Sequence, residues 1–266
     1  MADERHVGEA TERYTPQELM VAAASREIND ADTVFVGMRL PMLAFQLAVS
    51  THAQNALALY ESGVIRDDPA GTFIHTMCDL ANQHGAVATT DMLSVMGRLQ
   101  RGDVDLGFLG TAEIDRYGNL NTTRVGPADD PIRLPGSGGA CDIACLADET
   151  VVLMPHEPRR FVNEVAYVTS PGYPDDGSGS AGRPTPGGGP RRLVTSQATF
   201  GFDHRGELFL RTVHPGVDEA AIHDDIPWEL GTQEEVDGTP VGRTETPSDQ
   251  ELELIREFDP EGFWTS

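Results

Sequence analysis

Short apolar runs alternate with longer amphipathic segments along most of this chain, and this alternation restricts the possible folds more than any other feature. The apolar runs, which predict buried strands, lie at residues 33–37, 56–60, 104–112 and 150–154. Segments with helical spacing or helix-start signals separate them, at residues 15–28, 41–52, 92–99 and 141–146. Strands that alternate with helices favour a mostly parallel sheet covered on both faces. We therefore predict an open α/β fold in a single domain.

Two capping boxes indicate where helices begin. In the first, Thr15 can cap the helix and Glu18 can bond back to the cap; the second pairs Ser248 with Glu251 and opens a C-terminal helix. The residues before the first box, 1–14, are polar and predict a flexible tail.

Residues 171–192 interrupt the alternation. Twelve of these 22 residues are Gly or Pro, a composition typical of a loop. We predict a surface insertion within a domain that spans residues 15–266. Shorter elements follow it, with strands near 193–195 and 208–213 and a helix near 217–222.

The charge balance excludes several kinds of partner and chemistry. The chain has 43 acidic residues against 19 basic ones, a net charge of −24, and every basic residue is arginine. A negative surface repels nucleic acids and anionic membranes, so we expect neither as a partner. Without lysine, the chain cannot form a Schiff base or use a lysine-dependent phosphate loop. The composition also favours a halophilic cell interior, where salt screens repulsion among carboxylates, over an ordinary acidic protein.

No targeting signal or metal site is visible in the sequence. The first residues lack a basic segment followed by an apolar one, and no apolar run reaches the roughly 18 residues of a membrane span, so we expect a cytoplasmic protein. The three cysteines, Cys78, Cys141 and Cys145, are too few for a disulfide framework and have no further ligands at zinc spacing. We predict that they are small buried hydrophobes.

The first candidate for chemistry is Glu61, which begins the tripeptide Glu61-Ser62-Gly63 after the apolar run 56–60. Open α/β sheets place their sites at the carboxyl ends of strands. A glutamate held dry against its target can act as a covalent nucleophile, and we expect Gly63 to leave room for a bulky substrate. Taken alone, the tripeptide favours an ordinary charged residue at a strand-to-loop junction.

The second candidate is the glycine loop formed by Gly136, Gly138, Gly139 and Ala140. Such a loop lets backbone N–H groups converge before a helix, where they can hold a phosphate or stabilise an oxyanion. It is not a dinucleotide fingerprint, because Cys141 occupies the third glycine position. The loop alone favours a plain turn before a helix.

Two further patterns carry less weight. Arg159 and Arg160 could clamp a carboxylate or phosphate, although a solvated face or a subunit contact is favoured. The segment Gly136-Ser137-Gly138 lacks the G-x-S-x-G spacing of a serine hydrolase.

Together these segments resemble the β subunit of family I coenzyme A-transferases, and within that family the B subunit of the glutaconate type. The matching stretches occur in the family's order, at residues 61–65, 114–121, 136–144, 154–172 and 253–260. They cover the chain from about residue 16 to 260, and the block at 154–172 is the most specific.

The resemblance implies a fold of the NagB/RpiA/CoA-transferase type and a role for each candidate. It makes Glu61 the nucleophile and places Gly136, Gly138, Gly139 and Ala140 at the coenzyme A site. It also implies a separate α subunit that completes the active site in a hetero-oligomer. Coenzyme A would be a substrate, with no permanently bound cofactor and no metal.

The resemblance further implies a ping-pong reaction. Glu61 would attack an acyl-CoA thioester to give a mixed anhydride, then a glutamyl-CoA thioester, which an acceptor carboxylate would resolve. Two alternatives remain open: a CoA-thioester hydrolase on the same scaffold, and a non-catalytic partner subunit of a CoA-transferase complex. The sequence does not identify the acid that is exchanged.

Overall fold

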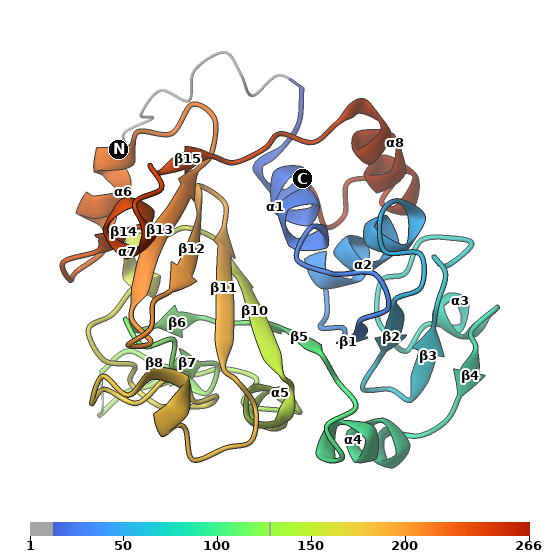
Figure 1. The fold of residues 1–266 in the computed structure, drawn as a ribbon. Coiled ribbons are helices and arrows are strands. Elements are labelled where there is room, and N and C mark those ends of the chain that lie inside the picture. Colours follow the sequence, from blue (N-terminus) through green and yellow to red (C-terminus); the bar gives the residue numbers. More distant parts are fainter. Residues whose placement is uncertain (1–12, 128) are drawn as a thin grey trace.

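One sheet runs through the molecule (Figure 1). The computed structural model describes residues 13–127 and 129–266, so residues 1–12 of the predicted tail lie outside the described residues. In order across the sheet, its 11 strands are β14 (Gly231–Thr232), β13 (Leu208–Val213), β12 (Ala198–Phe202), β11 (Pro190–Thr195), β10 (Glu149–Met154), β5 (Leu106–Gly110), β1 (Thr33–Phe35), β2 (Leu57–Leu59), β3 (Val64–Arg66) and β4 (Ala88–Thr89), with β15 (Gly242–Arg243) paired to β13.

The centre of this sheet is parallel and its flanks contain antiparallel hairpins. Parallel pairing joins β11, β10, β5, β1 and β2. Antiparallel pairing joins β2 to β3 and β3 to β4 on one side, and β11 to β12 and β12 to β13 on the other. Short connections can join only antiparallel neighbours, whereas parallel neighbours need a crossover. The predicted open, mostly parallel sheet is confirmed, and the hairpin flanks are an addition to it.

Helices cover both faces, as predicted. They are α1 (Pro16–Ser25), α2 (Leu40–Ser50), α3 (Leu80–Gln83), α4 (Met92–Gln100), α5 (Ala140–Leu146), α6 (Glu219–Asp225), α7 (Gln233–Asp237) and α8 (Asp249–Phe258). Buried residues of α1, α2 and α8 share one hydrophobic core, and those of α4, α5 and α6 share the other. The central strands explain this division, since Val34 and Val36 enter the first core and Phe35 the second. Strands covered on both faces are apolar at every position, which is why they appear as continuous apolar runs.

Two small hairpins lie beside the main sheet (Figure 1). One pairs β6 (Glu113–Ile114) with β7 (Leu120–Asn121), and the other pairs β8 (Arg124–Val125) with β9 (Ile132–Arg133). The chain then passes through the glycine loop into α5, so these hairpins lie next to the candidate site along the sequence.

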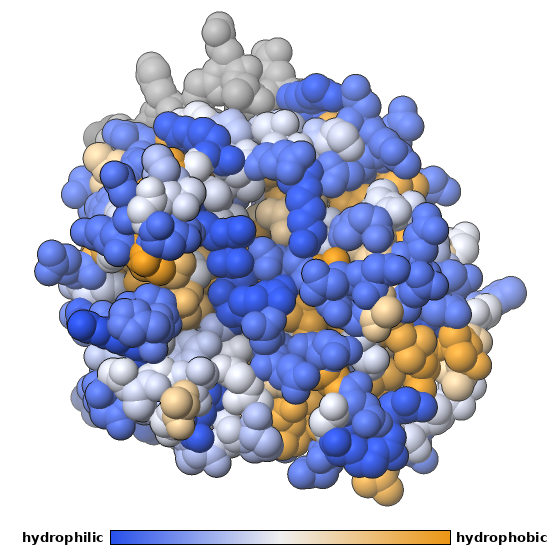
Figure 2. Space-filling view, in the orientation of Figure 1, coloured by the Kyte–Doolittle hydropathy of each residue, from blue (hydrophilic) through white to orange (hydrophobic). Residues whose placement is uncertain are grey.

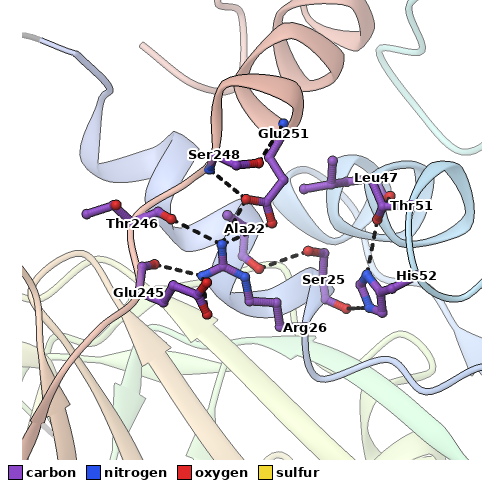
Figure 3. Close-up of polar contacts among 10 residues, drawn as sticks. All are labelled: Ala22, Ser25, Arg26, Leu47, Thr51, His52, Glu245, Thr246, Ser248 and Glu251. Carbon is purple, nitrogen blue, oxygen red and sulfur yellow. Dashed lines mark hydrogen bonds and ion pairs between the residues drawn. The ribbon is translucent and has the colours of Figure 1, made fainter.

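The C-terminal helix is held to the first helix by polar contacts (Figure 3). Arg26, which ends α1, donates from Nη2 to Glu251 Oε2 over 2.8 Å and from Nη1 to the carbonyl oxygen of Glu245 over 2.7 Å. The same Glu251 closes the predicted capping box by accepting the Ser248 N–H. The box at Thr15 and Glu18 is present as well. Both predicted helix starts are therefore confirmed.

The Gly/Pro-rich segment 171–192 has only a short 3-10 helix, η3 (Gly179–Gly182), before its last residues join β11. Inside the segment, the buried Arg183 donates to the carbonyl oxygens of Gly187 and Ala144 over 3.0 and 2.8 Å. These bonds attach the segment to the body of the protein next to α5.

Polar residues cover most of the face seen in Figure 2, as expected for a chain of net charge −24. Hydrophobic side chains gather on the right of that view, over α3 and β4. The segment from α3 to α4 exposes several of them: Leu80, Val87, Met92 and Leu93. Leu80 and Leu93 are each 81% exposed, and exposed apolar side chains that gather in one patch are typical of an interaction surface.

Candidate active site

Glu61 lies in the tight turn that joins β2 to β3. The turn is closed by two backbone bonds, from the Tyr60 N–H to the Val64 oxygen over 2.9 Å and from the Gly63 N–H to the Tyr60 oxygen over 2.8 Å. Glu61 is half-buried at this position. Main-chain bonds therefore fix the backbone from which the Glu61 side chain extends.

Gly63 has a different role from the one expected. Its φ is +97°, and a Cβ there would lie 2.5 Å from the carbonyl oxygen of Thr90, whose N–H donates to the Gly63 oxygen over 2.8 Å. The expectation that Gly63 leaves room for a substrate is wrong, because the backbone of Thr90 occupies that space. Glycine is required here for the left-handed turn and for the close backbone approach.

Further bonds anchor the same turn. The Ser62 hydroxyl donates to the Met77 oxygen over 3.0 Å. In β3, the buried Arg66 guanidinium donates to the carbonyl oxygens of Asn82 and His84 over 2.7 and 2.9 Å. The segment that carries the exposed hydrophobic side chains is thereby bound to the hairpin that carries Glu61.

The glycine loop lies directly against the Glu61 carboxylate. A Cβ added to Gly139 would be 3.2 Å from Glu61 Oε1 and 3.5 Å from Oε2, and one added to Gly138 would be 3.9 Å from Oε1. The two candidates that the sequence offered separately are therefore neighbours. A side chain at position 139 would crowd the carboxylate, which explains why this position favours glycine.

Backbone bonds hold the loop in shape. The Gly136 N–H donates to the Thr122 oxygen, and the Thr122 hydroxyl donates back to the Gly136 oxygen, both over 2.8 Å. Ser137 accepts the Ala140 N–H at its carbonyl oxygen and the Cys141 N–H at its hydroxyl. Gly136 and Gly138 both have positive φ, which favours glycine at these positions.

Two amides beside the carboxylate remain without an acceptor. Within residues 13–127 and 129–266, neither the Gly138 N–H nor the Gly139 N–H donates a hydrogen bond, and the Glu61 carboxylate accepts none. Unpaired N–H groups can stabilise an oxygen on which negative charge develops. A carboxylate without donors keeps its lone pairs available for a new bond. The arrangement is thus suited to acyl transfer.

The two paired arginines form local hydrogen bonds. Arg159 and Arg160 end the 3-10 helix η2 (Pro158–Arg160), and both bind Glu157, over 2.6 Å from Arg159 Nε and 3.3 Å from Arg160 Nη2. Arg160 also donates to the Thr111 oxygen over 3.4 Å. Local contacts account for both guanidinium groups, so they give no support to a clamp for a carboxylate or phosphate.

The cysteines are less buried than predicted. Cys78 is exposed, and Cys141 and Cys145 are half-buried on α5, so the prediction of three buried hydrophobes is wrong. On α5, Ile143 and Ala144 occupy the buried positions instead of the two cysteines. Partial burial and the neighbouring Cys141 raise the pKa of Cys145 to about 11, which makes it a poor nucleophile at neutral pH.

Two buried histidines escaped the sequence reasoning. His156 Nδ1 lies 3.0 Å from Thr195 Oγ1, and His214 Nε2 lies 2.9 Å from the Thr195 oxygen. Burial lowers the pKa of each to about 4, so both rings are neutral at pH 7. They join the ends of β10, β11 and β13 and have a structural role. Nothing in the sequence distinguishes them from exposed histidines.

Metal binding and membrane insertion have no support in the described residues. No group of three His, Cys, Asp or Glu side chains there is arranged to hold a metal ion. Over the same ranges, each helix is too short or too polar to cross a bilayer.

Comparison with known proteins gives a consistent result. The family model for Coenzyme A transferase matches residues 17–222. The chain is 34% identical to the B subunit of 3-oxoadipate CoA-transferase from Pseudomonas knackmussii, over 91% of this chain and 92% of that protein. It is 30% identical to the B subunit of glutaconate CoA-transferase from Acidaminococcus fermentans, over 93% of each.

Solved structures agree with the sequence relatives. The crystal structure of glutaconate coenzyme A-transferase from Acidaminococcus fermentans matches with a TM-score of 0.83 and 28% identity, over 96% of this chain and 98% of that one. The decarboxylase AibA/AibB matches with a TM-score of 0.78 and 27% identity, over 94% and 97%. The fold therefore supports more than one reaction, whereas the family match extends along most of the sequence. This chain belongs to the coenzyme A transferase family.

Proposed function

We propose that this chain is the nucleophile-bearing subunit of a CoA-transferase, and that Glu61 forms the covalent intermediates. The observation that carries the proposal is the contact between the Glu61 carboxylate and the Gly138–Gly139 loop, 3.2 Å from the Cβ position of Gly139. Family membership supports the reaction class, and this geometry supports the choice of Glu61.

The reaction begins with a balanced acyl transfer. A Glu61 oxygen attacks the thioester carbonyl carbon, the carbon–sulfur bond breaks, and CoA leaves as a thiolate, so that a mixed anhydride of Glu61 and the acyl group remains. The thiolate then attacks the Glu61 carboxyl carbon, which releases the first acid as a carboxylate and leaves a glutamyl-CoA thioester.

The second half repeats these steps in reverse with another acid. The acceptor carboxylate attacks the glutamyl thioester, and the thiolate returns to the new acyl group. Glu61 is regenerated as a carboxylate, and no net proton is gained or lost.

The glycine loop supplies the electrostatic part of the reaction. Each attack places negative charge on a carbonyl oxygen, and the unpaired Gly138 and Gly139 N–H groups belong to the loop that contacts the carboxylate. Losing one such donor costs roughly 100- to 1,000-fold in rate in comparable enzymes.

We also propose that a second subunit completes the site. The exposed hydrophobic side chains Leu80, Val87, Met92 and Leu93 belong to the segment from α3 to α4, which binds the Glu61 turn through Thr90, and Met77 just before α3 binds it as well. Apolar surface of this kind is typical of an interface. The two sequence relatives are each named as the B subunit of their enzyme, which supports the assignment of an α-type partner.

The proposed substrates are dicarboxylic acids and their CoA thioesters. The two named relatives act on 3-oxoadipate and glutaconate, both of which are dicarboxylic acids. A panel of acceptor acids of increasing length, assayed with one acyl-CoA donor, gives the order of preference. A preference for monocarboxylic acceptors would exclude this substrate class.

The deciding experiment compares Glu61→Gln with Glu253→Gln in the purified complex. Glu253 is exposed on α8, so its variant matches the charge change alone. We expect Glu61→Gln to lose roughly a thousandfold or more of the activity, because an amide is a poor nucleophile, and Glu253→Gln to retain it. Incubating the wild type with acyl-CoA and then borohydride should leave a reduced adduct on Glu61, detected by mass spectrometry.

Each alternative predicts a different result. Full activity in Glu61→Gln would assign the chain a non-catalytic role. Thioester turnover at the same rate with and without an acceptor acid would indicate a hydrolase.

A further inference from the structure

Two arginines face each other across the β8–β9 hairpin. Arg124 and Arg133 are direct partners in its antiparallel register, so their side chains leave the same face. Like charges in this position destabilise a hairpin. Both residues are exposed. The chain has 43 acidic residues, yet neither of these two opposed positions carries one.

No carboxylate neutralises this pair in the part of the chain that the structure describes. Most other arginines there bind an acidic side chain, as Arg26 binds Glu251, whereas neither Arg124 nor Arg133 forms an ion pair. Asp129 and Asp130 lie in the connection of the same hairpin, yet neither is paired with these arginines. The two positive charges are thus free to bind an external anion.

The backbone at Arg124 is held firmly. The fully buried Asn121 donates from Nδ2 to the Arg124 oxygen over 2.6 Å and accepts the Arg124 N–H at Oδ1 over 3.3 Å. The guanidinium of Arg124 lies 5.6 Å from the ring centre of Tyr167, which is 46% exposed. An aromatic face orients an arginine without neutralising it.

The same hairpin leads directly into the glycine loop. Thr122 exchanges two hydrogen bonds with Gly136, and the Leu134 N–H donates to the Thr123 oxygen over 3.0 Å. Arg133 precedes Gly136 by three residues, which corresponds to about 10 Å of extended chain. The arginine pair therefore lies close to the loop that contacts the Glu61 carboxylate, within the reach of a long substrate bound at that loop.

We propose that Arg124 and Arg133 bind the phosphate groups of the coenzyme A moiety. The proposal rests on the proposed function, because it assumes that the thioester carbonyl lies at Glu61. Planar guanidinium groups bind phosphate oxygens through paired N–H donors. A bound phosphate would also relieve the repulsion between the two arginines. Contacts to parts of a substrate that do not react supply binding energy that can be used at the reacting carbon.

The test measures binding, so that it does not depend on turnover. Equilibrium dialysis with the complex carrying Glu61→Gln compares CoA with pantetheine, which has the thiol arm but no phosphate. We expect Arg124→Gln and Arg133→Gln each to weaken CoA binding about tenfold, because one charge-assisted hydrogen bond contributes about a factor of ten to affinity. The double variant should then bind CoA about a hundredfold more weakly. Pantetheine binding should stay unchanged.

Arg205→Gln is the matched control. Arg205 is exposed in the turn between β12 and β13, and no ion pair involves it among the described residues. Its variant should bind CoA like the parent. Inorganic phosphate should compete with CoA in the parent and lose this effect in the double variant.

Three results would overturn the proposal. The first is unchanged CoA binding in the double variant, and the second is an equal loss of affinity for CoA and for pantetheine. The third is loss of the partner subunit during purification of the variant, which would make the hairpin an interface. Failure of the proposed function is distinguishable, because a wild-type complex that binds neither CoA nor pantetheine would refute that function before any arginine is changed.

Discussion

Glu61 and Glu251 are both partly buried glutamates, but they have opposite surroundings. Glu251 accepts bonds from the Ser248 N–H and the Arg26 guanidinium at the junction of α1 and α8 (Figure 3). Glu61 accepts none from the described residues and lies against bare glycine backbone. Glu251 is therefore held in place by donors, whereas Glu61 keeps its oxygen lone pairs available for a new bond, as the proposed nucleophile requires.

Acidification should have the largest effect of all on the free energy of unfolding. It acts through two buried histidines and not through Glu61. The pKa values of His156 and His214 fall from 6.5 in the unfolded chain to about 4 in the fold, through burial. Their stabilisation is complete above pH 6.5 and is lost as the pH falls towards 4, by about 3 kcal/mol for each ring.

Urea unfolding at a series of pH values measures this loss. The free energy of unfolding should be flat above pH 7 and should fall steadily between pH 6.5 and 4. A constant free energy across that window would show that the buried rings titrate normally.

Gly139→Ala should have the next largest effect and acts on the proposed nucleophile, Glu61. Gly139 has φ −80°, which alanine adopts without strain, so the added Cβ at 3.2 Å from Glu61 Oε1 is the main change. Displacing a reacting group by a fraction of its contact distance costs about a hundredfold in kcat. Steady-state kinetics of the complex should show this loss with an unchanged melting temperature.

Gly97→Ala in α4 is the control, because a Cβ there meets nothing within 4 Å. It should leave the rate unchanged and stabilise the helix by up to about 1 kcal/mol. Equal rates in the Gly139 variant and the wild type would mean that the carboxylate does not react from its observed position.

Glu251→Gln should have the smallest effect and should spare catalysis. Burial alone would raise the pKa of Glu251, but the bonds from Ser248 and Arg26 outweigh it, so the pKa lies below its usual value. The ionised form therefore stabilises the fold above about pH 4.5, and this contribution is lost as the pH falls further. We expect a loss of about 1 to 2 kcal/mol at pH 7.

Denaturant unfolding at pH 7 and at pH 3.5 tests the variant, whose difference from wild type should shrink at the lower pH. A fall in kcat of the folded variant would contradict the division between structural and reactive glutamates.

The sequence predicted the elements of this site better than their arrangement. The alternation of apolar runs identified the parallel centre of the sheet, because strands buried on both faces leave a direct signature. Glu61 and the glycine loop were each found, but each alone favoured an ordinary turn. The turn after β2 and the start of α5 come together only in the folded protein. No local sequence pattern predicts that contact.

The errors have the same origin. Gly63 was assigned to substrate access because its contact with Thr90 arises from distant pairing in the sheet. The cysteines of α5 were judged by residue type, while their exposure depends on what covers the helix. Arg124 and Arg133 drew no attention because nine positions separate them, and only the hairpin register makes them partners.

Because the Glu61 turn is closed by main-chain bonds and one glycine and anchored by the Ser62 hydroxyl, the other side chains around it are not needed to hold it in place. Under the proposed function, those other side chains can be exchanged over evolution to accept new acids while the turn keeps its position. An engineer who wishes to change the acid should accordingly redesign the walls of the site and leave the 60–64 turn and its Thr90 contact untouched.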